Sequence, residues 1–271
     1  MAARRPGFES DRAFATTLAR GLSVLRAFRT SDDGLSNAQI AERTGLPKST
    51  VSRLTFTLGS LGYLTQPQRH DRYRLGPTLM ALGHVAQAGL SFLEPAQEMM
   101  QALADETGAP VLFALRDRDK LAVMRVWRPA RAAAVGPEIG QRLPLAGSAS
   151  GLAVLGASTG AEFARLLADR PDPARDGTPL TALRDGARGQ LAAQGYVMAQ
   201  ARLPGLAGVS VPFRSARLAG PAAFTCAAGA GGGADPETGP RLCDAVAALH
   251  RLTGAGASPV WADPRRDQPD A

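Results

Sequence analysis

The 271-residue chain contains little cysteine and histidine, and no long apolar run. Its two cysteines, Cys226 and Cys243, match neither a disulfide framework nor a metal motif, which suits a reducing cytoplasm. No run of about 18 apolar residues occurs, so we expect no membrane span. The N-terminal segment MAARRPGFESD lacks the apolar region of a signal peptide. These absences predict a cytoplasmic protein without a membrane partner.

The sequence also lacks the residue groupings that catalysis needs. His70, His84 and His250 are scattered, and no serine or cysteine follows the pattern of an activated nucleophile. The glycine run at 231–233 lacks the Lys and Ser/Thr of a phosphate-binding loop. We therefore assign no catalytic residue, no metal ligand and no cofactor, and we expect no enzyme.

Positive charge is concentrated in the first third of the chain. Residues 1–83 hold 12 Lys or Arg and 6 Asp or Glu, so they carry six of the seven net positive charges. A localised basic excess is the electrostatic footprint of a nucleic-acid-binding domain. Basic surfaces also occur without nucleic acid, so the charge carries weight only together with a motif.

Residues 35–64 predict two short helices joined by a tight turn. Ser36 and Gln39 form a capping-box pattern at the start of the first helix, and Gly45 can end it in a left-handed conformation. Pro47 suits the start of the second helix. Apolar residues of the second helix recur at helical spacing and predict one buried stripe: Val51, Leu54, Leu58 and Leu61.

The second helix keeps small and cationic side chains away from this stripe. Lys and Arg pair with phosphates and guanine edges, and short hydroxyl side chains allow close approach in the major groove. An ordinary helical hairpin with a solvated polar face is the alternative. The side chains expected to face the major groove are Lys48, Ser49, Thr50, Ser52 and Arg53.

A basic hairpin, predicted over 64–75, favours the DNA-binding interpretation. Two short strands flank a polar turn, and Arg72 and Arg74 share one side of the second strand. A helix-turn-helix followed by such a hairpin is a winged helix, whose arginines hold phosphates or enter a minor groove. Arg20 is a further candidate for a phosphate contact. It lies in a helix expected over 14–29 with an apolar face comprising Leu18, Leu22, Leu25 and Phe28, with Val24 beside them.

The rest of the chain predicts one more helix and then an α+β domain. The helix, at 77–90, presents Leu79, Leu82 and Val85 either to its own domain or to a second chain. Beyond it, helices are segregated from largely antiparallel strands. Helices are expected at 91–107, 150–155, 162–169, 180–194 and 236–254, and strands at 109–116, 121–127, 132–135, 140–145, 196–199, 209–213 and 222–228. Residues 1–12 and 256–271 are expected to be disordered.

The loop LPLAGSASG at 143–151 combines apolar residues, small residues and the start of a helix. Backbone N–H groups at a helix N-terminus favour an anion such as a carboxylate. The loop is therefore either part of a site for a small organic acid or a tight helix entry whose small residues serve packing.

Several segments resemble the IclR family of bacterial transcriptional regulators. In the N-terminal part they are RGLSVL (20–25), GLPKSTVSRL (45–54), LGSLGYL (58–64) and YRLGPTLMALG (73–83). In the C-terminal part they are RVWRP (125–129), GQRLPLAGSASGLAVL (140–155), QGY (194–196) and PGLAGVSVPF (204–213). The likeness covers roughly residues 14–255.

The resemblance implies an α+β protein with an N-terminal winged helix-turn-helix domain (13–75), a linker and dimerisation helix (76–90) and a C-terminal GAF-like effector-binding domain (91–255). In that domain a curved sheet would have helices on one side and a ligand pocket on the other. It implies a transcriptional regulator that binds operator DNA and senses a small molecule, with an organic acid as our expectation. It also implies a homodimer, or a dimer of dimers, joined at the linker helix.

Carried over residue by residue, the resemblance implies an effector site made by Ala149, Ser150, Leu206, Gly208, Thr225 and Ala227. Polar residues frequent in the family's pocket are replaced here, for example His by Ala146, Lys by Leu152 and Cys by Gly208. We therefore expect either a more apolar effector or a domain that no longer binds one.

Two hypotheses from other classes remain. A metabolic enzyme can carry a winged helix as an oligomerisation module, and turnover of a small ester or acid would support that interpretation. A protein-interaction adaptor can use the same fold without binding DNA, but the charge excess in residues 1–83 argues against it.

Overall fold

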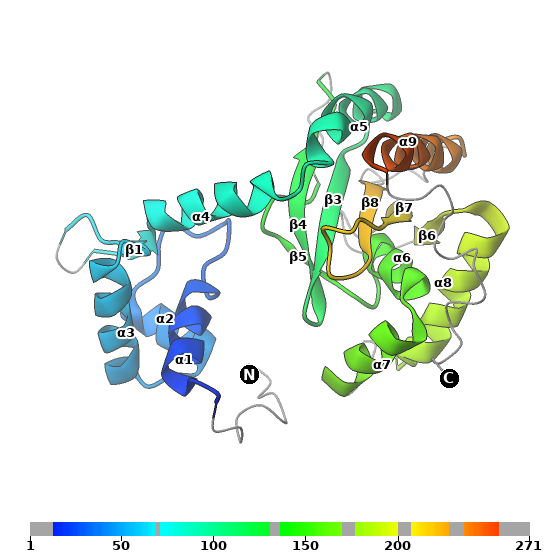
Figure 1. Cartoon of the computed structure of the whole chain (residues 1–271). Coiled ribbons are helices and arrows are strands. Elements are labelled where there is room, and N and C mark those ends of the chain that lie inside the picture. The colour runs from blue at the N-terminus through cyan, green and yellow to red at the C-terminus, as the bar shows by residue number, and fades with distance from the viewer. Residues whose placement is uncertain are drawn as a thin grey trace. The chain divides into compact units, whose positions relative to one another are not determined.

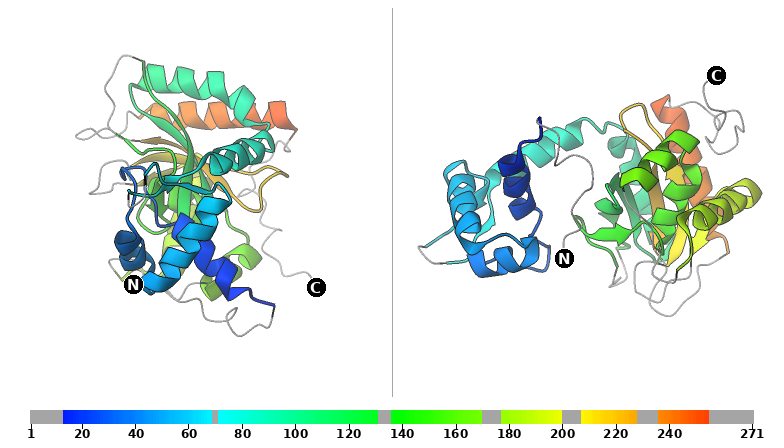
Figure 2. Two further views of the ribbon diagram at one scale, coloured as in Figure 1. Left: turned by 90° about the vertical axis from the view of Figure 1, so that its left-hand side faces the viewer. Right: turned by 90° about the horizontal axis from the view of Figure 1, so that it is seen from below.

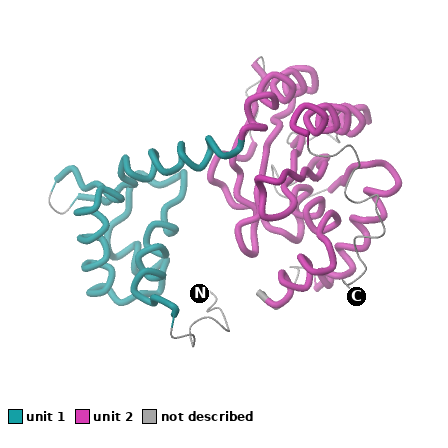
Figure 3. The backbone as a smooth tube through the Cα atoms, in the orientation of Figure 1, with its two compact units in different colours: residues 1–90 teal, residues 91–271 magenta. Residues whose placement is uncertain are grey.

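The chain folds into two compact units, Met1–Leu90 and Ser91–Ala271 (Figure 3). The computed structural model describes residues 13–68, 71–130, 136–169, 177–199, 207–227 and 236–254. The expected N-terminal arm (1–12), the strand at 132–135 and the tail (256–271) lie outside the described residues. Within the described part, no helix combines the length and the apolar character needed to cross a membrane.

The first unit is a three-helix winged fold followed by a fourth helix (Figure 1). Its elements are α1 (Thr16–Leu25), α2 (Asn37–Thr44), α3 (Lys48–Ser60), the antiparallel hairpin of β1 (Leu64–Thr65) and β2 (Arg74–Leu75), and α4 (Pro77–Ala88). A single bridge between Leu35 and Tyr73 adds a third strand position to the hairpin. The predicted winged helix-turn-helix is confirmed.

The turn between α2 and α3 has the predicted local chemistry. The Ser36 hydroxyl accepts a hydrogen bond from the Gln39 backbone N–H (3.3 Å), and the Gln39 side chain accepts one from the Ser36 N–H (3.0 Å). Gly45 ends α2 with φ +70°, a left-handed conformation that costs glycine little. Thr55 of α3 is buried, and its hydroxyl lies within hydrogen-bond distance of the Asn37 side-chain oxygen on α2 (3.0 Å), a contact that links the two helices.

The core of this unit differs in two places from the expected apolar stripes. Leu18 and Leu22 are exposed, because the short α1 turns Gly21 and Val24 toward the core and ends at Leu25. Leu61 is also exposed, since α3 has already ended at Ser60 and the helical spacing no longer applies. The buried core consists of Val24, Ala27, Leu35, Ile40, Val51 and Leu64.

The helix α4 has no buried residue. Its apolar side chains, among them Met80, Leu82 and Val85, are exposed in the single chain. Apolar residues on an unpartnered helix are typical of a surface that another protein surface covers.

The second unit is built on a six-stranded antiparallel sheet with the strand order β5-β4-β3-β8-β7-β6. The strands are β3 (Val111–Asp117), β4 (Lys120–Trp127), β5 (Arg142–Pro144), β6 (Val197–Ala199), β7 (Gly208–Phe213) and β8 (Ala222–Ala227). The helices are α5 (Leu93–Thr107), α6 (Ala149–Ala157), α7 (Gly160–Asp169), α8 (Leu180–Gln194) and α9 (Thr238–Thr253). The predicted α+β class is confirmed.

Helices cover both faces of this sheet, so the expected arrangement with helices on one side only is wrong (Figure 2). The helices α5 and α9 lie side by side on one face, and α6 packs on the other with α8 behind it. The reason is that every residue of β7 and β8 is buried, which requires cover on both sides. On the α5–α9 face, four phenylalanine rings lie 4.8 to 6.4 Å apart: Phe92, Phe113, Phe213 and Phe224.

The left-handed turn at Gly45 gives a first test. We expect Gly45→Ala to destabilise the helix-turn-helix by about 1 kcal/mol, because an L-residue pays that order of energy at positive φ although the space around it is open. Gly59→Ala, at the exposed second-last residue of α3, should instead stabilise the unit by about 0.4–1 kcal/mol, because alanine can adopt the helical backbone there and loses less conformational entropy on folding. Hydrogen exchange of the Ile40 and Val51 amides measures both effects. Equal shifts for the two variants would contradict the assignment.

Candidate nucleic-acid interface and effector site

The helix α3 presents the predicted DNA-facing side chains on its outer surface. Lys48, Ser49, Ser52 and Arg53 are exposed, and Thr50 is half-buried. Pro47 is the N-cap of α3, and no side chain accepts a hydrogen bond from the first-turn N–H groups. These N–H groups carry the partial positive charge of the helix dipole, which adds to the charges of Lys48 and Arg53. The face therefore has the charge, the small size and the donors that suit a major groove.

Both wing arginines belong to the same unit as α3, and Arg74 already has carboxylate partners. The Arg74 guanidinium is 3.0 Å from the Asp33 carboxylate and 3.9 Å from that of Asp71. Arg72 donates to the Gly34 carbonyl at 3.4 Å. Because the side chain of Asp33 is 90% exposed, this ion pair is worth little and can open when a phosphate competes.

The remaining predicted contact, Arg20, is exposed on α1, a helix that packs against α3. The sequence interpretation missed Phe56, a residue of α3 that is 74% exposed. Its spacing was the available signal, since Phe56 follows Ser49 by seven residues and Arg53 by three and therefore shares their side of the helix.

In the second unit, three buried hydroxyl groups meet between α6 and the sheet. The Thr225 hydroxyl on β8 lies 2.7 Å from the Ser150 hydroxyl at the start of α6 and 2.8 Å from the Ser210 hydroxyl on β7. The Ser210 hydroxyl also reaches the Phe224 carbonyl at 3.1 Å. All three side chains are at most 2% exposed, and we call them the hydroxyl cluster. Each hydroxyl group can rotate and donate to an acceptor placed among them.

The structure brings most of the predicted effector residues to this place. Ser150 and Thr225 touch directly, Gly208 and Ala227 are paired across β7 and β8, and Ala149 is buried beside Ser150. Leu206 lies outside the described residues. Ser210 was missed, although it stands two residues after Gly208 on a strand and so shares its face of the sheet.

The loop before α6 is also a tight helix entry. The Ser148 hydroxyl accepts a hydrogen bond from the Gly151 N–H (3.0 Å) and donates to the Pro144 carbonyl (2.6 Å). A Cβ atom on Gly151 would lie 2.1 Å from the Leu145 carbonyl oxygen, so no larger residue fits there. The small residues of this loop thus serve packing, whatever else the loop binds.

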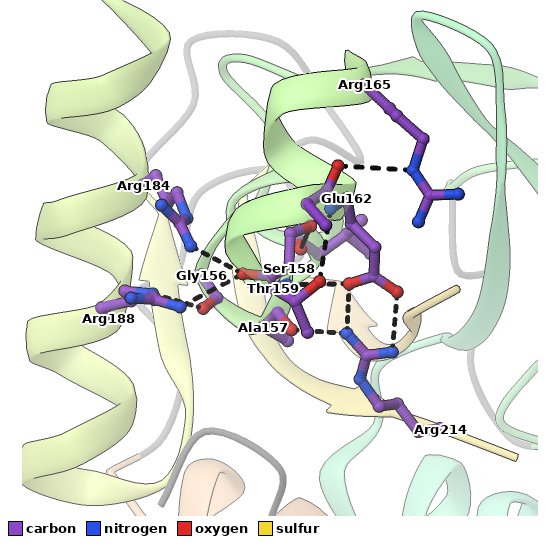
Figure 4. Close-up of polar contacts among 11 residues, drawn as sticks. Gly156, Ala157, Ser158, Thr159, Glu162, Arg165, Arg184, Arg188 and Arg214 are labelled. Carbon is purple, nitrogen blue, oxygen red and sulfur yellow. Dashed lines mark hydrogen bonds and ion pairs between the residues drawn. The ribbon is translucent and has the colours of Figure 1, made fainter. Parts of the chain in front are cut away.

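Arginine side chains hold the opposite end of α6 (Figure 4). Arg214, just after β7, donates to the Ala157 carbonyl at 2.8 Å. Arg184 and Arg188 of α8 donate to the Ser158 carbonyl at 2.9 and 3.2 Å. Cations at a helix C-terminus satisfy its last carbonyls and oppose the negative end of the dipole.

One carboxylate lies beside this arginine cluster. Glu162 of α7 forms a two-point ion pair with Arg214 (2.9 and 2.5 Å) and accepts a hydrogen bond from the Thr159 N–H at 2.8 Å. Burial raises the pKa of Glu162, but the hydrogen bonds from Arg214 and Thr159 outweigh it and leave the pKa below its ordinary value. The ionised carboxylate therefore stabilises the fold and joins α7 to the segment that follows β7.

Burial disfavours the charged forms of two side chains that can take part in catalysis, Cys226 and His250. Burial raises the pKa of the Cys226 thiol more than its hydrogen bond with Thr107 lowers it, and so disfavours a nucleophilic thiolate. Burial lowers the pKa of His250, whose ring packs on Phe213. Among the described residues, no group of His, Cys, Asp or Glu could hold a metal ion.

These elements define a class: a winged helix-turn-helix unit followed by an α+β unit. The family model of the IclR helix-turn-helix domain matches residues 17–68. A solved structure of an IclR family transcriptional regulator from Brucella abortus is 33% identical, and the match covers 90% of this chain and 94% of that one with a TM-score of 0.72. The chain therefore belongs to the IclR family.

Other relatives agree with this assignment over part of their length. The regulator TsaQ1/TsaQ2 of Comamonas testosteroni is 38% identical over 149 residues, which are 54% of this chain and 53% of that protein. The Pca regulon regulatory protein of Pseudomonas putida is 35% identical over 144 residues, or 53% and 49%. The match thus spans about half the length of these curated relatives. An IclR homologue from Microbacterium hydrocarbonoxydans, solved with 4-hydroxybenzoate, shares the fold at 22% identity, with 89% and 100% coverage and a TM-score of 0.69.

The ion pair at the end of α6 predicts a pH-dependent stability. We expect Glu162→Gln to lower the free energy of unfolding of the second unit by about 1–3 kcal/mol at pH 7, because it leaves Arg214 without its charged partner. Since the pKa of Glu162 is lowered in the folded state, its contribution is fully present above the ordinary glutamate pKa. The difference should shrink as the pH falls through the folded-state pKa. Denaturant unfolding followed by the fluorescence of the buried Trp127 measures it.

The matched control is Glu106→Gln. Glu106 forms an exposed ion pair with Arg241 at 3.5 Å, and such pairs contribute little. An equal loss of stability in the two variants would show that Glu162 has no special role.

Proposed function

We propose that the protein is a transcriptional regulator that binds operator DNA through α3 and its wing. The observation that carries this proposal is the two-sided character of α3. Val51 and Thr55 are buried, whereas Ser49, Ser52 and Arg53 are exposed. The localised positive charge of residues 1–83 and the membership of the IclR family support it.

In this proposal each part of the chain has the role that the sequence predicts. Residues 13–75 bind DNA, the helix within 76–90 joins two copies, and residues 91–255 bind an effector. The exposed apolar side chains of α4 support a homodimer, because one winged helix contacts few base pairs and duplication supplies affinity. The protein acts in the cytoplasm, where its DNA is, and catalyses no reaction.

The effector that the hydroxyl cluster suits is a small, largely apolar organic acid. Its hydroxyls at Ser150, Ser210 and Thr225 can turn from one another to a carboxylate, while the surrounding side chains are apolar. Ligand binding then shifts the population of conformations that place the two reading helices on DNA. 4-Hydroxybenzoate, the ligand of the Microbacterium homologue, is the first compound to test.

The DNA-binding role predicts a specific effect of Arg53. We expect Arg53→Ala to weaken binding to the specific duplex by about 1–3 kcal/mol if Arg53 pairs with a base edge. Fluorescence anisotropy with a duplex selected from a random pool, against a scrambled duplex and over a salt series, measures the change. Arg217→Ala is the control, because it removes the same charge from an exposed position of the second unit.

The outcomes separate the hypotheses. Specific binding that weakens with salt and with Arg53→Ala, but not with Arg217→Ala, supports the regulator. Failure to select any preferred duplex, with equal weak binding to all sequences, would overturn it in favour of an adaptor or an enzyme.

The effector role predicts an effect of the central hydroxyl. We expect 4-hydroxybenzoate to bind the wild-type protein and Thr225→Val to weaken that binding about 10- to 100-fold, the cost of one hydrogen bond to a charged group. Isothermal titration calorimetry measures both. Thr253→Val is the control, because its hydroxyl bonds only within α9 on the other face of the sheet. Equal binding by all three proteins would show that the hydroxyl cluster is not the site.

A further inference from the structure

We propose that Phe56 contacts the 5-methyl group of a thymine in the major groove and so helps to set which DNA sequence the protein prefers. This inference rests on the proposed DNA-binding function and adds a residue that the motif did not include.

The first argument is where Phe56 lies. Its side chain is 74% exposed, and within α3 it is the one exposed large hydrophobic residue. At 3.6 residues per turn it is two turns from Ser49, about 20° away around the axis, and lies between Ser52 and Arg53 in projection. The buried Val51 is about 140° away on the same helix. Phe56 therefore occupies the centre of the face that carries the cationic and hydroxyl side chains.

The second argument is that nothing in the fold uses the ring. The core of the first unit is formed by residues on the opposite side of α3, with Leu54 and Leu58 packed against it. Phe56 is not among the side chains packed on that core. The contacts of the described residues therefore give the Phe56 ring no role in stabilising the helix-turn-helix.

The third argument concerns the neighbours on α3. Thr57 and Ser60 donate their hydroxyl hydrogens to the Arg53 and Phe56 carbonyls, both at 3.0 Å, and so have committed their donors to the helix itself. In the C-terminal half of α3, Phe56 is therefore the side chain on this face that is available for contact with a partner. An apolar protein interface would need further apolar residues around the ring, and this face has polar ones.

The surface of duplex DNA fits this mixture of groups. The phosphates complement Lys48, and the base edges offer hydrogen-bond partners to Ser49, Ser52 and Arg53. The thymine 5-methyl is the one apolar group on the major-groove edges, and phenylalanine is among the side chains that contact it. An aromatic ring at the centre of a cationic, hydroxyl-rich helix face is therefore suited to contact a thymine whose neighbouring bases and phosphates bind the polar side chains.

The test removes the methyl group from the DNA and the ring from the protein. Duplexes are first selected from a random pool with the wild-type protein, and each thymine of the selected site is then replaced by deoxyuridine. Anisotropy titrations at fixed salt compare the wild-type protein, Phe56→Ala and the control Leu61→Ala. Leu61 is also an exposed large hydrophobic residue (60%), but it follows α3 as its C-cap.

We expect one deoxyuridine position in each half-site to weaken wild-type binding about fourfold, the value of burying one methyl-sized group. Phe56→Ala should bind the thymine duplex more weakly and be insensitive to that replacement, whereas Leu61→Ala should respond as the wild type does. Selection repeated with Phe56→Ala should also lose the preference for thymine at that position.

Two results would overturn the inference, and they differ from a failure of the proposed function. In the first, a preferred duplex is selected, but replacing thymine by deoxyuridine affects the wild type and Phe56→Ala equally at every position. Phe56 then contacts no thymine methyl group, although the protein still binds DNA as a regulator. If Leu61→Ala abolishes the same sensitivity, the effect does not arise from the ring. If no preferred duplex is selected at all, the DNA-binding function itself fails.

Discussion

The burial of one side of α3 is the constraint on which the rest of the first unit depends. Val51 and Thr55 are removed from solvent against α1 and α2, and the Thr55 hydroxyl is satisfied by Asn37. Burial of the apolar side fixes the rotation of the helix, since any other rotation would expose that side and bury Arg53. The outward face is thus a consequence of the core, and the core determines which side chains are available to a partner.

The second unit depends in a similar way on α6. Eight of its nine residues are buried, with its N-terminus at the hydroxyl cluster and its C-terminal carbonyls held by arginines (Figure 4). The proposed effector site therefore adjoins a helix whose opposite end contacts α8 and Arg214.

Much of the architecture followed from local patterns. The capping box at Ser36, the turn at Gly45 and the alternation of the strands each have a short-range physical cause, and the structure has these elements within a few residues of the expected bounds. The errors concern which residues of a helix face the core and where the helix ends. Leu18, Leu22 and Leu61 have the spacing of a buried stripe, but α1 turns Gly21 and Val24 toward the core and α3 ends before Leu61.

The sequence by itself determined the two-part organisation and the cationic, hydroxyl-rich face of α3, because helix periodicity and turn chemistry are local properties. The family followed from the resemblance of several segments, not from periodicity. Only the tertiary structure decided that helices cover both faces of the sheet, that Ser210 joins Ser150 and Thr225, and that Phe56 stands free among polar neighbours. The physical reason is that these facts concern contacts between residues far apart in the chain or the lack of such contacts. The spacing of neighbouring residues indicates on which side of an element a residue lies, but not which distant residues cover that side.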